Sequence, residues 1–247
     1  MAWDLVADIY DQYVTTDLDI PFFLEEAGQA PGGILELMCG TGRVSLPLLA
    51  AGAHLTLVDG SPRMLQVLRR KLAQQGFSPP VYEMDVRALA LPSQFDLILV
   101  PFNAFSELIA AEDRRETLRR IYEHLAAGGR AIVTLHNPKV RLKTVDEQLK
   151  LAGRRDLPGG TLLFWMWQKY LPEEERVTGL QFYEHYDQGG LMASRRMLEI
   201  NFALVGDDEF GAMAKAAGFK VEELFGDYTR APFDRETTPY QIWVLRK

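Results

Sequence analysis

The first half of the chain alternates short apolar segments with amphipathic ones, and this pattern constrains the fold more than any other feature. Strands are expected at the apolar segments Gly33–Leu37, His54–Val58, Val81–Met84, Phe95–Val100 and Arg130–Leu135. Helices are expected at Arg43–Ala51, after Ser61-Pro62 and at Arg114–Leu125; a hydroxyl residue followed by proline is a typical helix start. Strands that alternate with helices predict an α/β protein with a doubly wound parallel sheet and helices on both faces.

The second half changes character after Arg155. Three segments rich in aromatic and branched residues, separated by turn residues, predict antiparallel strands at Thr161–Leu171, Arg176–Tyr186 and Leu191–Leu204. A helix is then expected at Asp207–Ala217, followed by a terminal pair of strands at Phe219–Phe225 and Tyr240–Arg246. The chain is therefore expected to be one α/β domain over residues 1–247, with a small antiparallel β insertion at residues 155–205.

Charge and composition exclude several classes of partner. The formal net charge of −7 argues against binding to nucleic acid or to an anionic membrane, because both require a basic surface. It favours a neutral or cationic small molecule. A single cysteine, Cys39, and four histidines without zinc spacing predict no metal site and a reducing compartment. The acidic N-terminal stretch and the lack of an apolar run of about 18 residues predict a cytoplasmic protein, neither exported nor inserted.

The stretch from Glu36 to Gly42 carries the strongest functional signal. It lies at the carboxyl end of the first expected strand, where open α/β sheets bind ligands. Glycines there let the backbone approach a ligand, and the amides of the following helix face it. Asp59 follows the next strand, 19 residues after Gly40, at the position where an acid accepts hydrogen bonds from ribose hydroxyls. A cofactor that contains a nucleoside is implied.

Two residues favour a nucleoside-containing cofactor that is not a dinucleotide. The dinucleotide fingerprint requires a third glycine at position 45, where this chain has Ser45. Glu36 is poorly placed beside a pyrophosphate, whereas its carboxylate would suit the ammonium group of a methionine-type tail. An NAD-dependent oxidoreductase is therefore kept only as the weaker alternative.

On these residues the sequence resembles the class I S-adenosylmethionine-dependent methyltransferases of the small-molecule type. The family's motifs are matched in chain order by Glu36–Gly42, Asp59, Asp85, Phe95–Phe102 and Gly128-Gly129. Met38 departs from the pattern, because the family usually has its first glycine there. The resemblance implies a Rossmann-like seven-stranded sheet with an antiparallel last strand, and S-adenosyl-L-methionine as cofactor.

The resemblance also implies roles for individual residues. Asp85 and Val86 would hold the adenine edge, Met64 would pack on the adenine face, and Tyr10 and Tyr13 would fold over the cofactor as part of a lid. The cofactor-binding set inferred in this way is Tyr10, Tyr13, Glu36, Gly40, Gly42, Asp59, Gly60, Met64, Asp85, Val86 and Pro101. Pro101-Phe102-Asn103 stands where nucleic-acid amino-methyltransferases have a different motif, which again argues against nucleic acid.

The acceptor side is inferred from position and composition. His136 follows the fifth strand on the ligand side of the sheet and is the expected general base or orienting group. The aromatic insertion is expected to form a lid, an acceptor pocket or a homodimer surface, and its alternating large residues can also be core. The catalytic candidates are His136, Tyr183 and Tyr186, and the substrate-binding candidates are Asn103, Trp165, His185, Asp227 and Tyr228.

Together these features predict an enzyme that transfers a methyl group to nitrogen or oxygen of a small metabolite by direct displacement. Methyl transfer from an activated sulfonium mainly requires alignment and exclusion of water. The alternative from another class is a non-catalytic protein that binds S-adenosylmethionine. It would keep the fold and lack an open acceptor site.

Overall fold

The main body of the protein is a seven-stranded mixed sheet. The computed structural model describes residues 2–247, and the strand order is β10-β11-β5-β4-β1-β2-β3. Strands β1 to β5 pair in parallel, and β11 runs antiparallel to both of its neighbours. The predicted fold class, including the antiparallel last strand, is confirmed. The strands are β1 (Ile34–Leu37), β2 (Leu55–Asp59), β3 (Val81–Glu83), β4 (Phe95–Val100), β5 (Leu125–His136), β10 (Lys220–Phe225) and β11 (Tyr240–Arg246).

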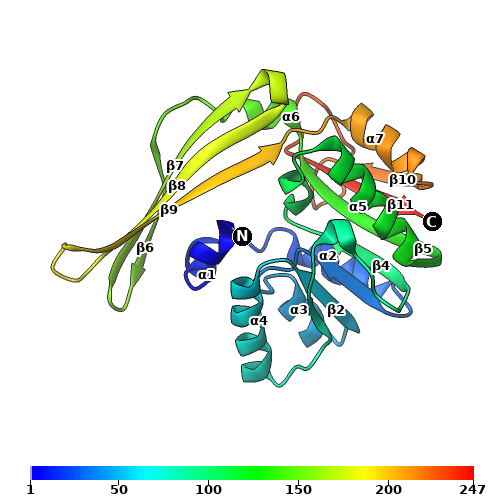
Figure 1. Cartoon of the computed structure of the whole chain (residues 1–247), viewed down its shortest axis with the longest axis horizontal. Coiled ribbons are helices and arrows are strands. Elements are labelled where there is room, and N and C mark those ends of the chain that lie inside the picture. The colour runs from blue at the N-terminus through cyan, green and yellow to red at the C-terminus, as the bar shows by residue number, and fades with distance from the viewer. Residues whose placement is uncertain (1) are drawn as a thin grey trace.

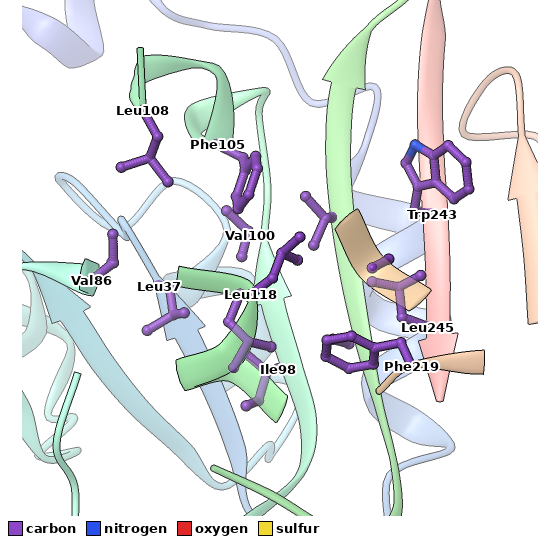
Figure 2. Close-up of a cluster of buried hydrophobic side chains, with 14 of the residues drawn as sticks. Leu37, Val86, Ile98, Val100, Phe105, Leu108, Leu118, Phe219, Trp243 and Leu245 are labelled. Carbon is purple, nitrogen blue, oxygen red and sulfur yellow. The ribbon is translucent and has the colours of Figure 1, made fainter. Parts of the chain in front are cut away.

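Helices cover both faces of this sheet because its central strands are apolar on both sides. On one face, Leu35 and Leu37 of β1 pack with side chains from α5 (Ala111–His124) and α7 (Asp207–Ala216), in the cluster that Figure 2 shows. On the other face, Ile34 packs with residues of α2 (Ile20–Gly28), α3 (Ser45–Ala50) and α4 (Pro62–Gln75). Alternation along β1 therefore directs Glu36 toward the α3 side. No helix in residues 2–247 is long and apolar enough to cross a membrane.

The insertion is a separate four-stranded antiparallel sheet that extends away from the main body (Figure 1). Its strands are β6 (Lys150–Leu157), β7 (Gly160–Leu171), β8 (Arg176–Tyr186) and β9 (Met192–Ala203). The sequence predicted the last three strands and missed β6, so the sheet begins at residue 150 instead of 155. β6 is a charged edge strand with mostly exposed side chains and no apolar alternation, a usual way to protect a sheet edge from association.

Short helical segments connect these parts. Near the N-terminus, η1 (Ala2–Leu5) and α1 (Tyr10–Tyr13) lie between the insertion and α4 (Figure 1). Val6 packs against Leu162 and Leu198 of the insertion, while Ala7 packs against Met64 of α4. This stretch, residues 2–13, is called the N-terminal segment below. The other short helices are η2 (Val86–Ala88), η3 (Ala104–Glu107), α6 (Pro138–Leu142) and η4 (Pro172–Glu174).

Candidate functional site

A pocket of about 620 Å³ lies at the carboxyl ends of β1, β2, β4 and β5. Its volume is within the range of roughly 300–1,000 Å³ that is usual for small-molecule sites. The N-terminal segment lines one part of the pocket and the insertion lines another. Of the predicted residues, those that line it are Tyr10, Glu36, Gly40, Asp59, Gly60, Met64, Asp85, Val86, Pro101, Asn103 and His136.

The turn after β1 has a left-handed backbone conformation that glycine adopts without strain. Gly40 has φ +56°, and a Cβ atom built there would meet nothing within 4 Å. Because Gly40 lines the pocket, the space beside it is open to a ligand. Met38 also adopts a left-handed φ, of 56°, which explains why glycine is the favoured residue at that position. Gly42 serves packing instead, since its added Cβ would lie 2.5 Å from Leu68 Cδ1.

Glu36 is a buried acid at the floor of the pocket. Its carboxylate accepts a hydrogen bond of 2.6 Å from the Ser45 hydroxyl, which gives a structural reason for serine at the position where the dinucleotide fingerprint has glycine. Burial raises the pKa of Glu36 to about 8, although the Ser45 hydrogen bond and the Arg43 charge act in the opposite direction. A ligand cation beside this carboxyl would therefore be accompanied by loss of its proton.

Asp59 is held in place by backbone amides. Its Oδ2 accepts a 2.8 Å hydrogen bond from Gly40 N–H, and its Oδ1 accepts one of 2.7 Å from Ser61 N–H. Burial raises the pKa of Asp59, and these backbone hydrogen bonds oppose the shift. Each carboxylate oxygen has a second lone pair, so the fixed side chain can also accept hydrogen bonds from a diol.

Asp85 and its neighbours form the far wall of the same pocket. Asp85 accepts hydrogen bonds from the Arg87 backbone N–H and from Arg87 Nε, both at 2.9 Å. The Arg87 hydrogen bonds lower the pKa of Asp85, so the acid is ionised and fixed in direction. Met64, which is 3% exposed, and Val86 provide apolar surface beside it.

The N-terminal segment covers this end of the pocket. Trp3 Nε1 donates a 2.9 Å hydrogen bond to Glu107 on η3, and the Thr41 hydroxyl donates one of 2.6 Å to Asp11. Tyr10 lines the pocket, and burial raises the pKa of its hydroxyl. Tyr13 does not line it; its ring lies 4.6 Å from that of Tyr183, centroid to centroid.

The other end of the pocket reaches under the insertion and contains polar side chains. We call it the acceptor chamber and define it by six pocket-lining residues: His136, Arg141, Met166, Gln168, Gln181 and Phe202. Arg141 Nη2 donates a 2.6 Å hydrogen bond to Gln168 Oε1, and the Arg141 guanidinium lies 5.2 Å from the Phe202 ring centroid. Burial, and secondarily the Arg141 charge, lowers the pKa of His136 to about 3. The imidazole is therefore neutral at physiological pH.

Asn103 stands between the two ends of the pocket. Phe102 and Asn103 have consecutive left-handed φ angles of 56° and 60°, a strained geometry for residues other than glycine. The Asn103 N–H is fixed by a 2.9 Å hydrogen bond to Thr134 Oγ1. Its side-chain Oδ1 is buried and has no hydrogen-bond partner within residues 2–247. Such an atom is a ready acceptor for a ligand N–H or O–H group.

Several predicted aromatic residues lie outside the pocket because of strand alternation. Met166 and Gln168 face inward from β7, so Trp165, the residue before Met166, faces the other side of the sheet. There, Glu184 Oε2 accepts hydrogen bonds from Trp165 at 2.9 Å and from the Tyr186 hydroxyl at 3.1 Å. Tyr183 faces inward but is only 1% exposed. Its hydroxyl donates to Gln181 Oε1 at 2.6 Å, so Tyr183 supports a pocket residue without lining the pocket.

Three further candidates also lie elsewhere. His185 is half-buried in β8 and is not among the pocket-lining residues. Asp227 Oδ1 accepts hydrogen bonds from the Thr229 amide and hydroxyl, at 2.8 and 2.7 Å. These hydrogen bonds stabilise a turn. Tyr228 packs on Phe22 of the core, with ring centroids 5.9 Å apart.

Sequence reasoning missed most of the acceptor chamber. Arg141 follows His136 on α6, a five-residue helix too short to give a periodic signal. Gln168, Gln181 and Phe202 come from three strands, and only the register of the sheet brings their inward faces together. The available signal for the acceptor chamber in β7 and β8 was the presence of polar residues, Gln168 and Gln181, among aromatic ones.

Comparisons with known proteins agree with this geometry. The profile of a family described as a methyltransferase domain matches residues 34–129. A candidate methyltransferase of Bacillus subtilis (strain 168) is 22% identical, covering 93% of this chain and 91% of the relative. An S-adenosylmethionine-dependent methyltransferase structure from Clostridium acetobutylicum ATCC 824 matches with a TM-score of 0.83 at 18% identity, over 100% of this chain and 99% of that one.

A third similar protein carries a more specific description. The structure of a sugar N-methyltransferase from Streptoalloteichus sp ATCC 53650 matches with a TM-score of 0.77 at 18% identity, over 97% of this chain and 92% of that one. At these identities the likeness to solved structures concerns the fold.

Proposed function

Because the chain is a class I S-adenosylmethionine-dependent methyltransferase, we propose that it methylates a nitrogen or oxygen atom of a small metabolite by direct displacement. The observation that carries this proposal is the continuity of the pocket. One cavity joins the Glu36, Gly40 and Asp59 end to the polar acceptor chamber, so a donor and an acceptor can meet inside it.

Three features of the cofactor-binding end support S-adenosylmethionine as its ligand. The open space beside Gly40 allows close approach of the ligand, Asp59 would accept hydrogen bonds from the ribose hydroxyls, and Glu36 would face the ammonium group. Asp85, Val86, Met64 and Pro101 would surround the adenine, with Tyr10 above the cofactor. The bound cofactor supplies an activated methyl group on sulfur.

The acceptor chamber would position the nucleophile. Asn103 Oδ1, buried and without a partner in the described chain, would accept a hydrogen bond from the acceptor's N–H or O–H and so direct a lone pair. His136, neutral because its pKa is about 3, would act as a second hydrogen-bond acceptor. An imidazole with that pKa is a weak base.

Nitrogen is the better supported target atom. A neutral amine has a free lone pair and needs no base at the moment of transfer, whereas an alcohol needs one. Of the six residues of the acceptor chamber, His136 alone could act as a base, and its low pKa suits orientation better than proton removal. Glu199 also lines this side of the pocket, but its side chain is exposed and accepts a hydrogen bond from Asn201. The N-methyltransferase with the similar fold supports the same choice.

The non-catalytic alternative predicts a filled acceptor side. In this structure the pocket extends beyond Asn103 to Gln168 and Gln181 under the insertion, which favours an enzyme. The roles of the insertion as a lid and as a homodimer surface stay predictions.

Two measurements test the proposal. Calorimetric titration with S-adenosylhomocysteine should show one site per chain, and NAD should not compete for it. Incubation with S-adenosylmethionine and a panel of small amines and phenols should release S-adenosylhomocysteine with some amines. Binding of NAD without binding of S-adenosylhomocysteine would refute the proposal, and turnover with phenols alone would refute the preference for nitrogen.

A further inference from the structure

Arg141 is the one pocket arginine in residues 2–247 without a carboxylate partner. Three arginines line the pocket. Arg43 forms a bidentate pair with Asp19 at 2.6 Å, and Arg87 pairs with Asp85 and with Asp113. No carboxylate lies within 4.0 Å of the Arg141 guanidinium in the same described chain.

The partners that Arg141 does have are neutral. Its guanidinium donates to Gln168 Oε1 and to the Thr144 hydroxyl, and it lies over the Phe202 ring. These contacts fix its direction without neutralising its charge. Burial of an uncompensated cation is unfavourable, and accordingly burial lowers the pKa of Arg141. Among the six residues that define the acceptor chamber, Arg141 alone is charged at neutral pH, and the acid that lines the pocket on the same side, Glu199, is exposed to solvent.

From this arrangement we propose that Arg141 binds an anionic oxygen group, a carboxylate or a phosphate ester, of the methyl acceptor. The inference rests on the proposed function and names its substrate class: a molecule that carries an amine and an anion. The Gln168 amide nitrogen has no partner in residues 2–247 and can donate to the same anion, because its oxygen already accepts from Arg141. Asn103 then receives the amine at the cofactor end of the chamber.

The sheet topology separates Arg141 from the cofactor-binding end. Arg141 lies on α6, directly after β5, whereas the glycine turn follows β1, and β4 lies between these two strands. The Arg141 hydrogen bond to β7 also anchors it to the insertion side of the pocket. The anion of the acceptor is therefore expected here, and the cofactor carboxylate elsewhere.

Matched pairs of acceptors test this inference. Turnover is measured with phenylalanine and phenethylamine, with glycine and methylamine, and with glucosamine 6-phosphate and glucosamine. In at least one pair, kcat/KM should be about 10- to 100-fold higher for the anionic member, as charge-assisted hydrogen bonds imply; the pair that responds distinguishes carboxylate from phosphate. Equal or greater turnover of the neutral members would overturn the inference.

Variants assign the effect to the side chain. Arg141→Gln should remove the preference for the anionic member, chiefly through KM, and Arg141→Lys should restore part of it. Arg155→Gln is the matched control, because Arg155 also lacks a carboxylate partner in the described chain but is exposed and outside the pocket. A large loss of S-adenosylhomocysteine affinity in Arg141→Gln would instead assign Arg141 to the cofactor and refute the inference.

A binding measurement decides the case in which no pair is methylated. With the protein saturated by S-adenosylhomocysteine, acetate and inorganic phosphate are titrated while the His136 imidazole is followed by NMR. Neutralising Arg141 should raise the His136 pKa, since the Arg141 charge lowers it. The wild type should show a saturable shift that Arg141→Gln lacks. No shift, or one that persists in the variant, would overturn the inference, whereas failure to bind S-adenosylhomocysteine would overturn the proposed function itself.

Discussion

Replacement of Glu36 by glutamine should change how the stability of the ligand-free protein depends on pH. The side chain is 1% exposed, and burial raises its pKa from 4.5 to about 8. Between these values the folded chain keeps a proton that the unfolded chain has lost. The contribution of Glu36 to the free energy of unfolding therefore falls as pH rises through this window, and it levels off above pH 8.

The magnitude follows from the two pKa values. Each pH unit inside the window lowers the Glu36 contribution to the free energy of unfolding by about 1.4 kcal/mol. Over the full interval between the two pKa values the contribution falls by at most about 5 kcal/mol. His136 acts in the opposite sense, because its pKa of about 3 makes stability rise with pH up to about 6.5. The contribution of Glu36 is thus isolated by the difference between wild type and Glu36→Gln, since both proteins keep His136.

Urea unfolding at several pH values between 4.5 and 8 measures this difference. Relative to wild type, Glu36→Gln should gain stability steadily with pH, and Glu83→Gln, at an exposed acid of β3, is the surface control. In the same variant the affinity for S-adenosylhomocysteine should be lower and should no longer increase with pH. A stability difference that does not vary with pH would show that Glu36 is ionised in the folded protein and would refute the reasoning.

Three further changes test other parts of the site. Asp59→Ala should weaken S-adenosylhomocysteine binding by about 1–3 kcal/mol in calorimetry, and an unchanged affinity would contradict its assignment to the ribose. His136→Gln should not change the pH profile of amine methylation, because the deprotonation of the acceptor's own ammonium group determines that profile. If the wild type shows an inflection near pH 6.5 that the variant lacks, His136 is a general base. Trp165→Leu removes the hydrogen bond to Glu184 and should lower Tm while kcat/KM stays unchanged, and a selective loss of turnover would place Trp165 at the acceptor.

The cofactor-binding half could be predicted from the sequence because local order determines it. Strand, glycine turn, helix and the next strand follow each other directly, so Glu36, Gly40 and Asp59 reach the same sheet edge by chain connectivity alone. Even the capping of α4 was evident, and the Ser61 hydroxyl accepts the Met64 N–H at 3.1 Å as expected.

The acceptor half could not be predicted in the same way. Which face of β7 turns inward depends on the register of strand pairing. A shift by one residue would place Trp165 in the pocket and turn Met166 away from it. Aromatic density was therefore a misleading signal, because the aromatic side chains largely pack with one another. The sequence also does not show that Arg141 lacks a carboxylate partner, because Asp146 and Glu147 follow it along the chain.

The contacts of the N-terminal segment lead us to expect a particular order of substrate binding and product release. The same few residues cover the cofactor end through Tyr10 and Trp3 and, through Val6, pack under the insertion that roofs the acceptor chamber. Cofactor exchange must therefore disturb the support of that roof. We expect the cofactor to enter first and to complete the acceptor chamber, and the demethylated cofactor to leave last, so that its release limits the rate of turnover.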